Sequence, residues 1–418
     1  MSDRIRVLPV REQSDVILRI LRRRLETILP VAMREAGLDL WLILCQEDDH
    51  DPVFRTMIPM NTWTPILQML VFHDRGVDEG VERINLSMTN TAGLYETPWK
   101  GTDSAEQWRS LERIVAERDP KRIGVNIGSV NWASGGLTHN LYLQLTRALP
   151  EKYADRIVSA ETACTRWLMT LSEEELELYP YIVSIAHSII ADCFSRETVI
   201  PGVTTTEDLE WAYWQRCADL GFEQAFKPHF RIVRDREAKV RYPIGDRVIR
   251  RGDVLHCDVG FRYLRLNTDH QELAYVRRDG EEDAPPGLKR LLAENNRLQR
   301  IYMEEFRRGL TGNQMLENML SRARDEGVPS PKVYSHSLGL YLHEPGPLIG
   351  LPWEQNRCSG RGDVKLEYDT CFTMELSVGD AVPEWDDGIV HLWTEQDVSF
   401  TRDGCRPMDG IQTSFHLI

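Results

Sequence analysis

Five acidic and imidazole side chains in the C-terminal half of the chain have residue types and spacing typical of metal ligands. They are Asp258, Asp269, His336, Glu375 and Glu395. Both glutamates lie within strand-like apolar runs, where a carboxylate is costly to bury unless it is paired or bound to a cation. Four carboxylates around one imidazole would also repel one another without a cation. The pattern therefore predicts a site for a carboxylate-bridged pair of metal ions.

The segments around these residues predict elements that can position them. Residues 253–261 and 266–276 have the apolar pattern of two strands joined by a turn, so Asp258 and Asp269 could face one ion across a hairpin. An alternative is that one aspartate is exposed on a strand and the other caps a turn. His336 and His343 lie seven residues apart around a glycine.

Taken in order, these motifs resemble those of the pita-bread metallopeptidases. That family includes methionine aminopeptidase, Xaa-Pro aminopeptidase and prolidase, with creatinase as a metal-free relative. The resemblance covers residues 172–418 well and the N-terminal part only in outline. Its motifs are D-x-G at 258–260, the second aspartate at 269, H-x-x-G-x-x-x-H at 336–343, T-x-E at 373–375 and E-x-D-V at 395–398.

The resemblance implies a role for each motif residue. Asp258 would bind one ion and His336 and Glu375 the other, while Asp269 and Glu395 would bridge both. The oxygen-rich set suits divalent manganese, cobalt, iron or zinc, and the residue types alone do not choose among them. Manganese is the first expectation for this family resemblance, with cobalt, zinc or iron as alternatives. Water activated between the ions would be the nucleophile. Glu375 would also handle its proton, and His343 would hydrogen-bond the substrate carbonyl.

The chain departs from the family at positions around the substrate. Arg241 and Lys332 stand where the peptidases carry histidines, and Trp393 stands where they often carry an arginine. His229 or His391 could replace the missing imidazole. Residues 269–272 read Asp-His-Gln-Glu in place of the usual D-x-T-R. We therefore expect an intact metal centre with a rebuilt substrate shell, and cations that favour substrates bearing a carboxylate.

Composition and periodicity support a two-domain α+β enzyme. Residues 1–168 alternate strand and helix patterns, which predicts a smaller α/β domain. The resemblance implies that this domain is of the creatinase type and that residues 169–418 form a pita-bread catalytic domain. Within that second part, a helix–helix–strand layout recurs after residues 202–204 and 309–311, which suggests an internal duplication. The acidic segment 46–51 is interpreted as a polar loop rather than a metal cluster.

Charge and cysteine content limit the classes of binding partner and the cellular compartment that we expect for the protein. A net charge of −15 without a basic tract argues against nucleic acid, and no stretch has the ~20 apolar residues of a membrane span. Eight cysteines without paired spacing, and a start at residues 1–6 without an apolar core, predict a cytoplasmic protein. Exposed-looking aromatics such as Trp63 and Trp99 favour a homodimer or higher homo-oligomer.

The function predicted from these features is hydrolysis of peptide C–N bonds by a dimetal aminopeptidase or dipeptidase of the Xaa-Pro-cleaving kind. Two alternatives stay open at this point. One is a metallohydrolase of a small non-peptide amide or amidine, which the changes at Arg241, Lys332 and Trp393 would favour. The other is a non-catalytic binding protein on the same fold.

Overall fold

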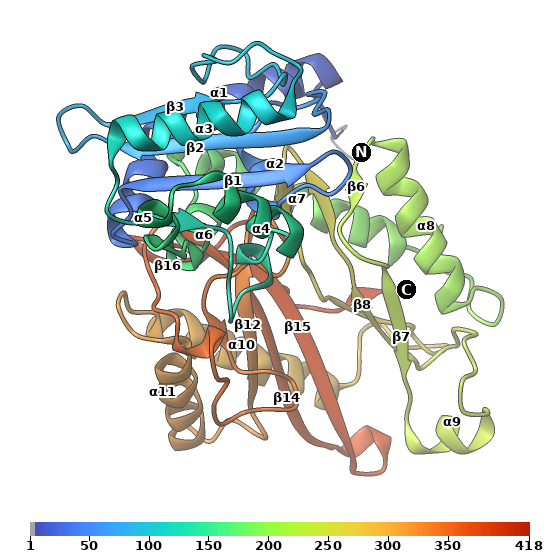
Figure 1. Cartoon of the computed structure of the whole chain (residues 1–418). Coiled ribbons are helices and arrows are strands. Elements are labelled where there is room, and N and C mark those ends of the chain that lie inside the picture. The colour runs from blue at the N-terminus through green and yellow to red at the C-terminus, as the bar shows by residue number, and fades with distance from the viewer. Residues whose placement is uncertain (1–4) are drawn as a thin grey trace. The chain divides into compact units, whose positions relative to one another are not determined.

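The computed structural model describes residues 5–418, which divide into two units (Figure 1). One unit is Leu8–Glu174, and the other is formed mainly by Glu175–Ile418. The predicted boundary between residues 168 and 169 falls inside helix α6 (Glu161–Met169), six residues before this division. The prediction about an N-terminal leader falls largely on residues 1–4, which lie outside the described residues.

The first unit is built on a five-stranded sheet in the order β3-β2-β1-β4-β5. Strand β1 is buried on both faces, which explains its continuous apolar run Leu-Trp-Leu-Ile-Leu-Cys. Leu40, Leu42 and Leu44 share one hydrophobic core with side chains of α3 and α4. The predicted smaller α/β domain is confirmed. Its strands are β1 (Leu40–Gln46), β2 (Leu67–Asp74), β3 (Val81–Asn85), β4 (Ile123–Val125) and β5 (Ile157–Ser159).

The helices of this unit follow the predicted apolar periodicity. They are α1 (Val10–Glu35), α2 (Pro52–Met57), α3 (Ser104–Arg118), α4 (His139–Ala148), α5 (Glu151–Ala154) and α6. The chain leaves β1 through an exposed turn at residues 47–49, as the polar-loop interpretation of segment 46–51 predicted. Asp51 differs from its neighbours, because it is only 1% exposed.

Asp51 caps helix α2 from a buried position. Its Oδ1 accepts hydrogen bonds from the backbone N–H groups of Val53 (2.8 Å) and Phe54 (3.0 Å), and its Oδ2 accepts one from the amide of Asn126 (2.9 Å). Burial is the main cause that raises the pKa of Asp51 from 3.8 to about 6, although these hydrogen bonds oppose the shift. The folded protein therefore holds this proton more tightly than the unfolded chain.

We expect the protein to lose stability as pH rises from 4 to above 6, because the raised pKa of Asp51 favours the folded state only while the carboxyl is protonated. The difference between 3.8 and about 6 corresponds to about 3 kcal/mol. In Asp51→Asn, urea unfolding at pH 4, 5, 6 and 7 should show a flatter dependence on pH, even though the lost Asn126 bond lowers stability overall. An unchanged slope would contradict this role of Asp51.

The second unit contains three sheets, ordered β10-β9-β6, β17-β11-β8-β7 and β13-β12-β14-β15-β16. Their strands are β6 (Glu223–Gln224), β7 (His229–Val233), β8 (Val254–Asp258), β9 (Phe261–Tyr263), β10 (Leu266–Asn267), β11 (Leu273–Tyr275), β12 (Lys332–Leu338), β13 (Leu348–Ile349), β14 (Thr370–Val382), β15 (Gly388–Thr401), β16 (Gly404–Pro407) and β17 (His416–Leu417). The helices are α7 (Glu173–Cys193), α8 (Thr206–Asp219), α9 (Arg236–Arg241), α10 (Pro286–Glu305) and α11 (Gly312–Asp325).

The predicted duplication in this unit is visible at the starts of α8 and α11. Each helix has a threonine N-cap, Thr205 or Thr311, that forms a capping box with the third helical residue. Each is preceded by a glycine with positive φ, Gly202 at 86° and Gly309 at 84°. In both halves, an antiparallel sheet follows this helix along the chain.

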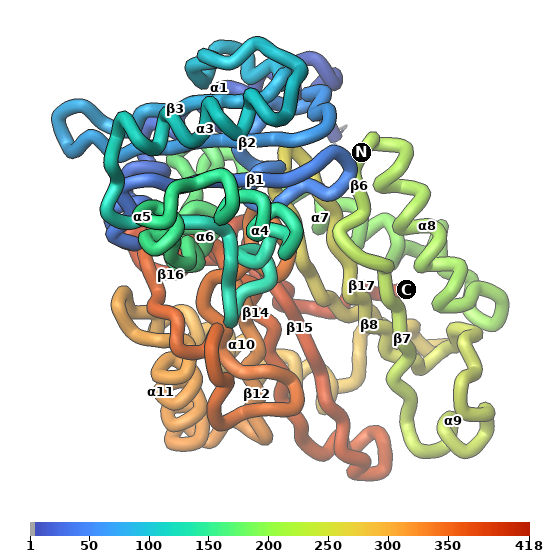
Figure 2. The backbone as a smooth tube through the Cα atoms, in the orientation of Figure 1, coloured from blue at the N-terminus to red at the C-terminus, as the bar shows by residue number. Residues whose placement is uncertain are grey.

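The two larger sheets meet at one backbone bridge. Gln271, next to β11, pairs with Glu395 of β15, and each backbone N–H of the pair donates to the other residue's carbonyl. Figure 2 shows the course of β14 and β15 in one of these sheets and of β7 and β8 in the other. The five predicted ligands lie on the strands and loops around the bridge. No helix among residues 5–418 is long and apolar enough to cross a membrane.

Candidate metal centre

Asp258 and Asp269 are brought to the same side of a hairpin by the pairing of Val259 with His270. By continuation of this register, Asp258 faces Gln271, and Asp269 lies two residues before Gln271 on the same face. Gly260 lets the two segments approach, because a Cβ at this position would lie 2.2 Å from the carbonyl oxygen of Thr268. The glycine of the D-x-G motif is therefore required by packing beside the ligands.

Gly260→Ala should destabilise the protein by about 1–3 kcal/mol, because the added methyl group overpacks against backbone that cannot move aside freely. It should also weaken metal binding by displacing Asp258 and Asp269. Thermal unfolding followed by elemental analysis checks both effects. Gly135→Ala is the matched control, because its Cβ would lie at an ordinary 3.5 Å from the backbone oxygen of Trp132. Equal melting temperatures for the two variants would contradict the packing argument.

The other three residues come from adjacent strands of the second sheet. Glu375 of β14 lies directly opposite Glu395 of β15, and on its other side opposite Tyr334 of β12. His336 lies two residues beyond Tyr334 on the same face of β12. Because neighbouring side chains on one face of a sheet converge, this register gathers an imidazole and two carboxylates beside the hairpin aspartates.

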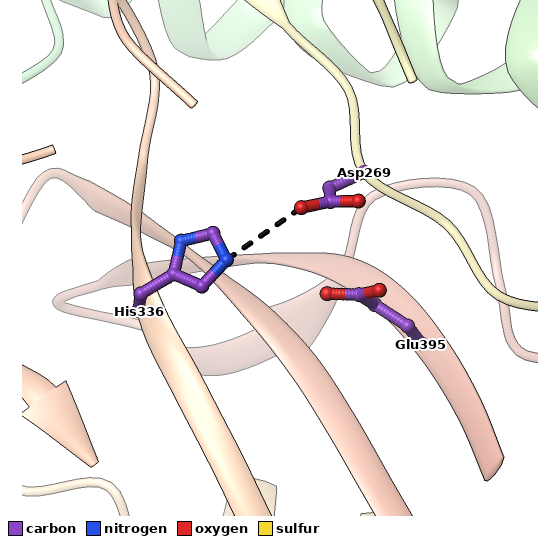
Figure 3. A group of neighbouring side chains, drawn as sticks. All are labelled: Asp269, His336 and Glu395. Atoms are coloured by element: carbon purple, nitrogen blue, oxygen red, sulfur yellow. Dashed lines mark ion pairs between the residues drawn. The ribbon is translucent and has the colours of Figure 1, made fainter. Parts of the chain in front are cut away.

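Asp269, His336 and Glu395 form the tightest group (Figure 3). One potential ligand atom from each lies within 4.8 Å of the others, and the His336 Nε2 atom is 3.5 Å from an oxygen of Asp269. All three residues are buried, with exposures of 5%, 0% and 1%. Asp258 and Glu375 are partly buried beside them, and their charges act on both Asp269 and Glu395.

The donor atoms of this group fit a metal ion. His336 Nε2 and Glu395 Oε1 are buried, and neither has a hydrogen-bond partner among the described residues. Burial holds the pKa of His336 well below its ordinary value, so the ring is neutral. Its Nδ1 lies 3.2 Å from the carbonyl oxygen of Ser337, which suits an N–H donor at Nδ1 and leaves the lone pair of Nε2 directed toward Asp269.

The carboxylates titrate abnormally for the same reason. Burial first, and repulsion from neighbouring carboxylates second, raise the pKa values of Asp269 and Glu395 well above their ordinary range. Burial also raises the pKa of Asp258 to about 6 and that of Glu375 to about 7. Such a cluster stays ionised near neutral pH only if a cation compensates its charge.

His343 is placed beside the cluster rather than within it. Its ring centroid lies 4.4 Å from that of His336, and it is the exposed residue of the loop between β12 and β13, whose other residues are buried or partly buried. Arg361 donates to the backbone carbonyls of Glu344 and Gly346 and so holds this loop. Partial burial, followed by the Arg361 charge, lowers the pKa of His343. A neutral ring at this position can donate one hydrogen bond to a substrate oxygen.

The predicted substrate residues lie at different places. His229 of β7 is exposed and pairs with Asp258, while His391 and Trp393 share the Glu395 face of β15. Lys332 is exposed four residues before His336 on β12. Arg241 ends α9 and lines a surface pocket with Arg236, Glu237, Val240 and Asp386.

Three neighbours of the cluster escaped the sequence analysis. Gln271 donates to Glu395 Oε2 (2.9 Å), and its Oε1 lies 2.8 Å from His256 Nε2. The two-residue spacing from Asp269 was a signal for Gln271, because alternate strand residues share a face. The third is Arg231, whose guanidinium lies 4.2 Å from the ring centroid of Trp393. Nothing in the local sequence indicated this contact.

Solved structures of other proteins share this fold across nearly the whole chain. An X-Pro aminopeptidase from Thermotoga maritima MSB8 matches with a TM-score of 0.64 and 18% identity, over 93% of this chain and 100% of that one. An Xaa-Pro dipeptidase from Bacillus anthracis matches with a TM-score of 0.59 and 17% identity, over 96% and 100%. No curated protein sequence matches.

A third matching structure is not named as a peptidase. The N-terminal domain of FACT complex subunit SPT16 from Cicer arietinum (chickpea) matches with a TM-score of 0.58 and 12% identity, over 94% of this chain and 97% of that one. At such identities the matches show the fold alone, which is the predicted α+β arrangement. The model of metallopeptidase family M24 matches residues 182–405, more than half of the 418 residues. The fold, the ordered motifs and this match together identify the chain as a member of metallopeptidase family M24.

Proposed function

We propose that the protein is a metal-dependent hydrolase of peptide C–N bonds, acting as an Xaa-Pro aminopeptidase or dipeptidase. The observation that carries this proposal is the buried cluster of Asp269, His336 and Glu395, in which His336 Nε2 and Glu395 Oε1 have no hydrogen-bond partner among the described residues. Asp258 and Glu375 complete the set, which would hold two divalent ions, manganese first. Bound ions would supply a water molecule that ionises near neutral pH.

The side chains around the ions would do the remaining work. Glu375, which would also be a metal ligand, can take a proton from the attacking water and return it to the leaving nitrogen. His343 can donate to the carbonyl oxygen of the scissile bond as that oxygen gains negative charge. Gln271 keeps Glu395 oriented through its 2.9 Å hydrogen bond.

Hydrolysis of a substrate panel tests this function. Purified protein should be assayed with dipeptides, tripeptides and small amides in the presence of Mn²⁺, Co²⁺ and Zn²⁺. We expect metal-dependent cleavage of peptides, and we expect the cleaved peptides to include some in which proline follows the scissile bond. Cleavage of small amides alone would instead support a non-peptide metallohydrolase, as the altered position Trp393 would allow.

The match to the SPT16 domain motivates a second candidate, a non-catalytic binding protein on the same fold. In that role the five proposed ligands would stabilise the fold and would not catalyse hydrolysis. Metal binding without hydrolysis of any panel member would favour this candidate over the first.

We also propose that the protein assembles as a homodimer or larger homo-oligomer. Trp63 is 70% exposed, which is high for a side chain type enriched at protein interfaces. The expectation for Trp99 was wrong, because Trp99 is only 7% exposed and packs in the core of the first unit. Light scattering of the full chain should give at least twice the monomer mass of 48.3 kDa, and Trp63→Ser should lower it. A monomer at all concentrations would contradict the proposal.

A further inference from the structure

Arg231 of β7 is a cation at the edge of the metal centre that the sequence analysis did not assign. We propose that Arg231, stacked on Trp393, forms a subsite that binds a carboxylate group of the substrate. This inference rests on the proposed function and deepens it, since it selects substrates that carry a free carboxylate beside the scissile bond.

The register of two sheets places Arg231 at this edge. On β7, His229 pairs with Asp258 and Arg231 pairs with His256, so Arg231 lies on the face that carries the hairpin ligands. Trp393 belongs to the other sheet, two residues before Glu395 on the same face of β15. The 4.2 Å stacking contact therefore spans the two sheets beside Asp258 and Glu395.

The guanidinium of Arg231 has unused hydrogen-bonding capacity. The Nε atom is buried without a partner, and no hydrogen bond or ion pair joins the Arg231 guanidinium to any other side chain or backbone group among the described residues. Its charge acts on Asp258 and Glu375, but neither is in hydrogen-bonding contact with it. Burial lowers the pKa of Arg231, which reflects the cost of placing an unpaired cation there.

An anionic ligand would remove this cost. A guanidinium presents N–H groups in a planar fork that matches the two oxygens of a carboxylate, and stacking on an indole fixes the plane of the fork. Metal ions bound by Asp258 and Glu375 would neutralise the carboxylates that now attract Arg231. The arginine would then be free to take a substrate carboxylate.

Other cations near the centre are less suited to this role. Arg361, beside His343, already donates to the carbonyl oxygens of Glu344 and Gly346. Lys332 is exposed on β12 and pairs with Ser377 of β14, which in turn pairs with Trp393 of β15. One strand therefore lies between Lys332 and Trp393. Arg241 lines a pocket whose other lining residues include none of the proposed metal ligands. Arg231 therefore replaces Arg241 and Lys332 as the residue expected to select a carboxylate.

Binding of an uncleavable probe tests the subsite directly. The probes are an alanyl-proline analogue with CH₂–N in place of the amide bond, and its C-terminal amide. Calorimetry in Mn²⁺ should show that wild-type protein binds the free acid about 10- to 100-fold more tightly than the amide. Arg231→Met should bind both probes with the affinity of the amide, and Arg231→Lys should keep part of the preference.

Controls separate recognition from structural effects. Arg236→Met removes an exposed arginine of α9 and should leave both affinities unchanged. Metal content, measured by elemental analysis, should be the same in wild type and in Arg231→Met. If Arg231→Met does not fold, Arg231→Lys provides the test. Its ratio of free-acid affinity to amide affinity should then be smaller than the ratio in wild type.

Three results would overturn the subsite: wild type binding neither probe, wild type binding both equally, or Arg231→Met losing metal or both affinities to the same extent. The last would mean that Arg231 supports the metal ligands instead. Failure of the proposed function looks different. In that case the preference for the free acid would be present and would depend on Arg231, while no peptide of the panel would be hydrolysed.

Discussion

Asp269→Ala is expected to lose both high-affinity metal binding and peptide hydrolysis. Asp269 lies within reach of His336 and Glu395 in the buried cluster and is proposed to bridge both ions. Its removal takes one ligand from each ion at once. Elemental analysis after dialysis should fall from about two ions per chain toward none, and hydrolysis should fall by about 10³-fold or more if the ions supply the nucleophile.

Thermal unfolding gives this prediction a second readout. Metal at 100 times its dissociation constant should stabilise wild-type protein by about 2.7 kcal/mol for each ion bound, and this gain should be absent from Asp269→Ala. In a chelator the variant should be at least as stable as wild type, because it lacks one of the mutually repelling carboxylates. Asp380→Ala, on the same strand as Glu375 but largely exposed, should behave as wild type. Full metal occupancy in Asp269→Ala would refute the bridging role.

The strands of the metal centre could be predicted from the sequence because the acidic ligand residues interrupt apolar strand patterns. Glu375 and Glu395 stand within apolar strand segments, and the structure confirms strands β14 and β15 there and pairs the two residues directly. The hairpin of Asp258 was also predicted, and its register follows from alternation of side chains along each strand. In such strands a polar residue on a buried face needs a partner, so residue type and spacing carry most of the information.

Contacts between sheets could not be predicted in this way. The stacking of Arg231 on Trp393 joins strands that are distant in sequence and belong to different sheets, so neither residue's neighbours indicate it. The same holds for Asp51, whose segment was interpreted as a polar loop. Its burial depends on Asn126, which follows β4. Local patterns report which face of an element is apolar, and they do not report which distant side chain will cover it.

The replaced segment Asp269-His270-Gln271-Glu272 illustrates both cases. Gln271 shares the face of Asp269, as alternation alone would indicate, and the structure shows that it also contacts Glu395 of the other sheet. His270 and Glu272 point the other way. His270 is fully buried, and Glu272 lies 2.5 Å from His416 of the C-terminal strand β17. The change from the family pattern on this second face therefore alters packing behind the centre, whereas the change at Gln271 alters the setting of a ligand.

His343→Ala is expected to lower kcat by about 10²-fold or more while metal content stays near that of wild type, as for a donor that acts on developing charge. The ring lies beside His336 but in a loop that Arg361 holds through two backbone carbonyls, so its loss leaves the five proposed ligands in place. Steady-state kinetics and elemental analysis of the same preparation check this expectation.

Two further histidine variants serve as controls for His343→Ala. His336→Ala should lose metal and activity together, because its unpartnered Nε2 faces the carboxylates of the cluster. His139→Ala, at the exposed start of α4, should change neither. If His343→Ala instead strips the metal while His336→Ala retains it, the roles of the two histidines are reversed. The ion then sits nearer the loop between β12 and β13 than β12 itself, and the donor to the substrate carbonyl has to be sought on β12.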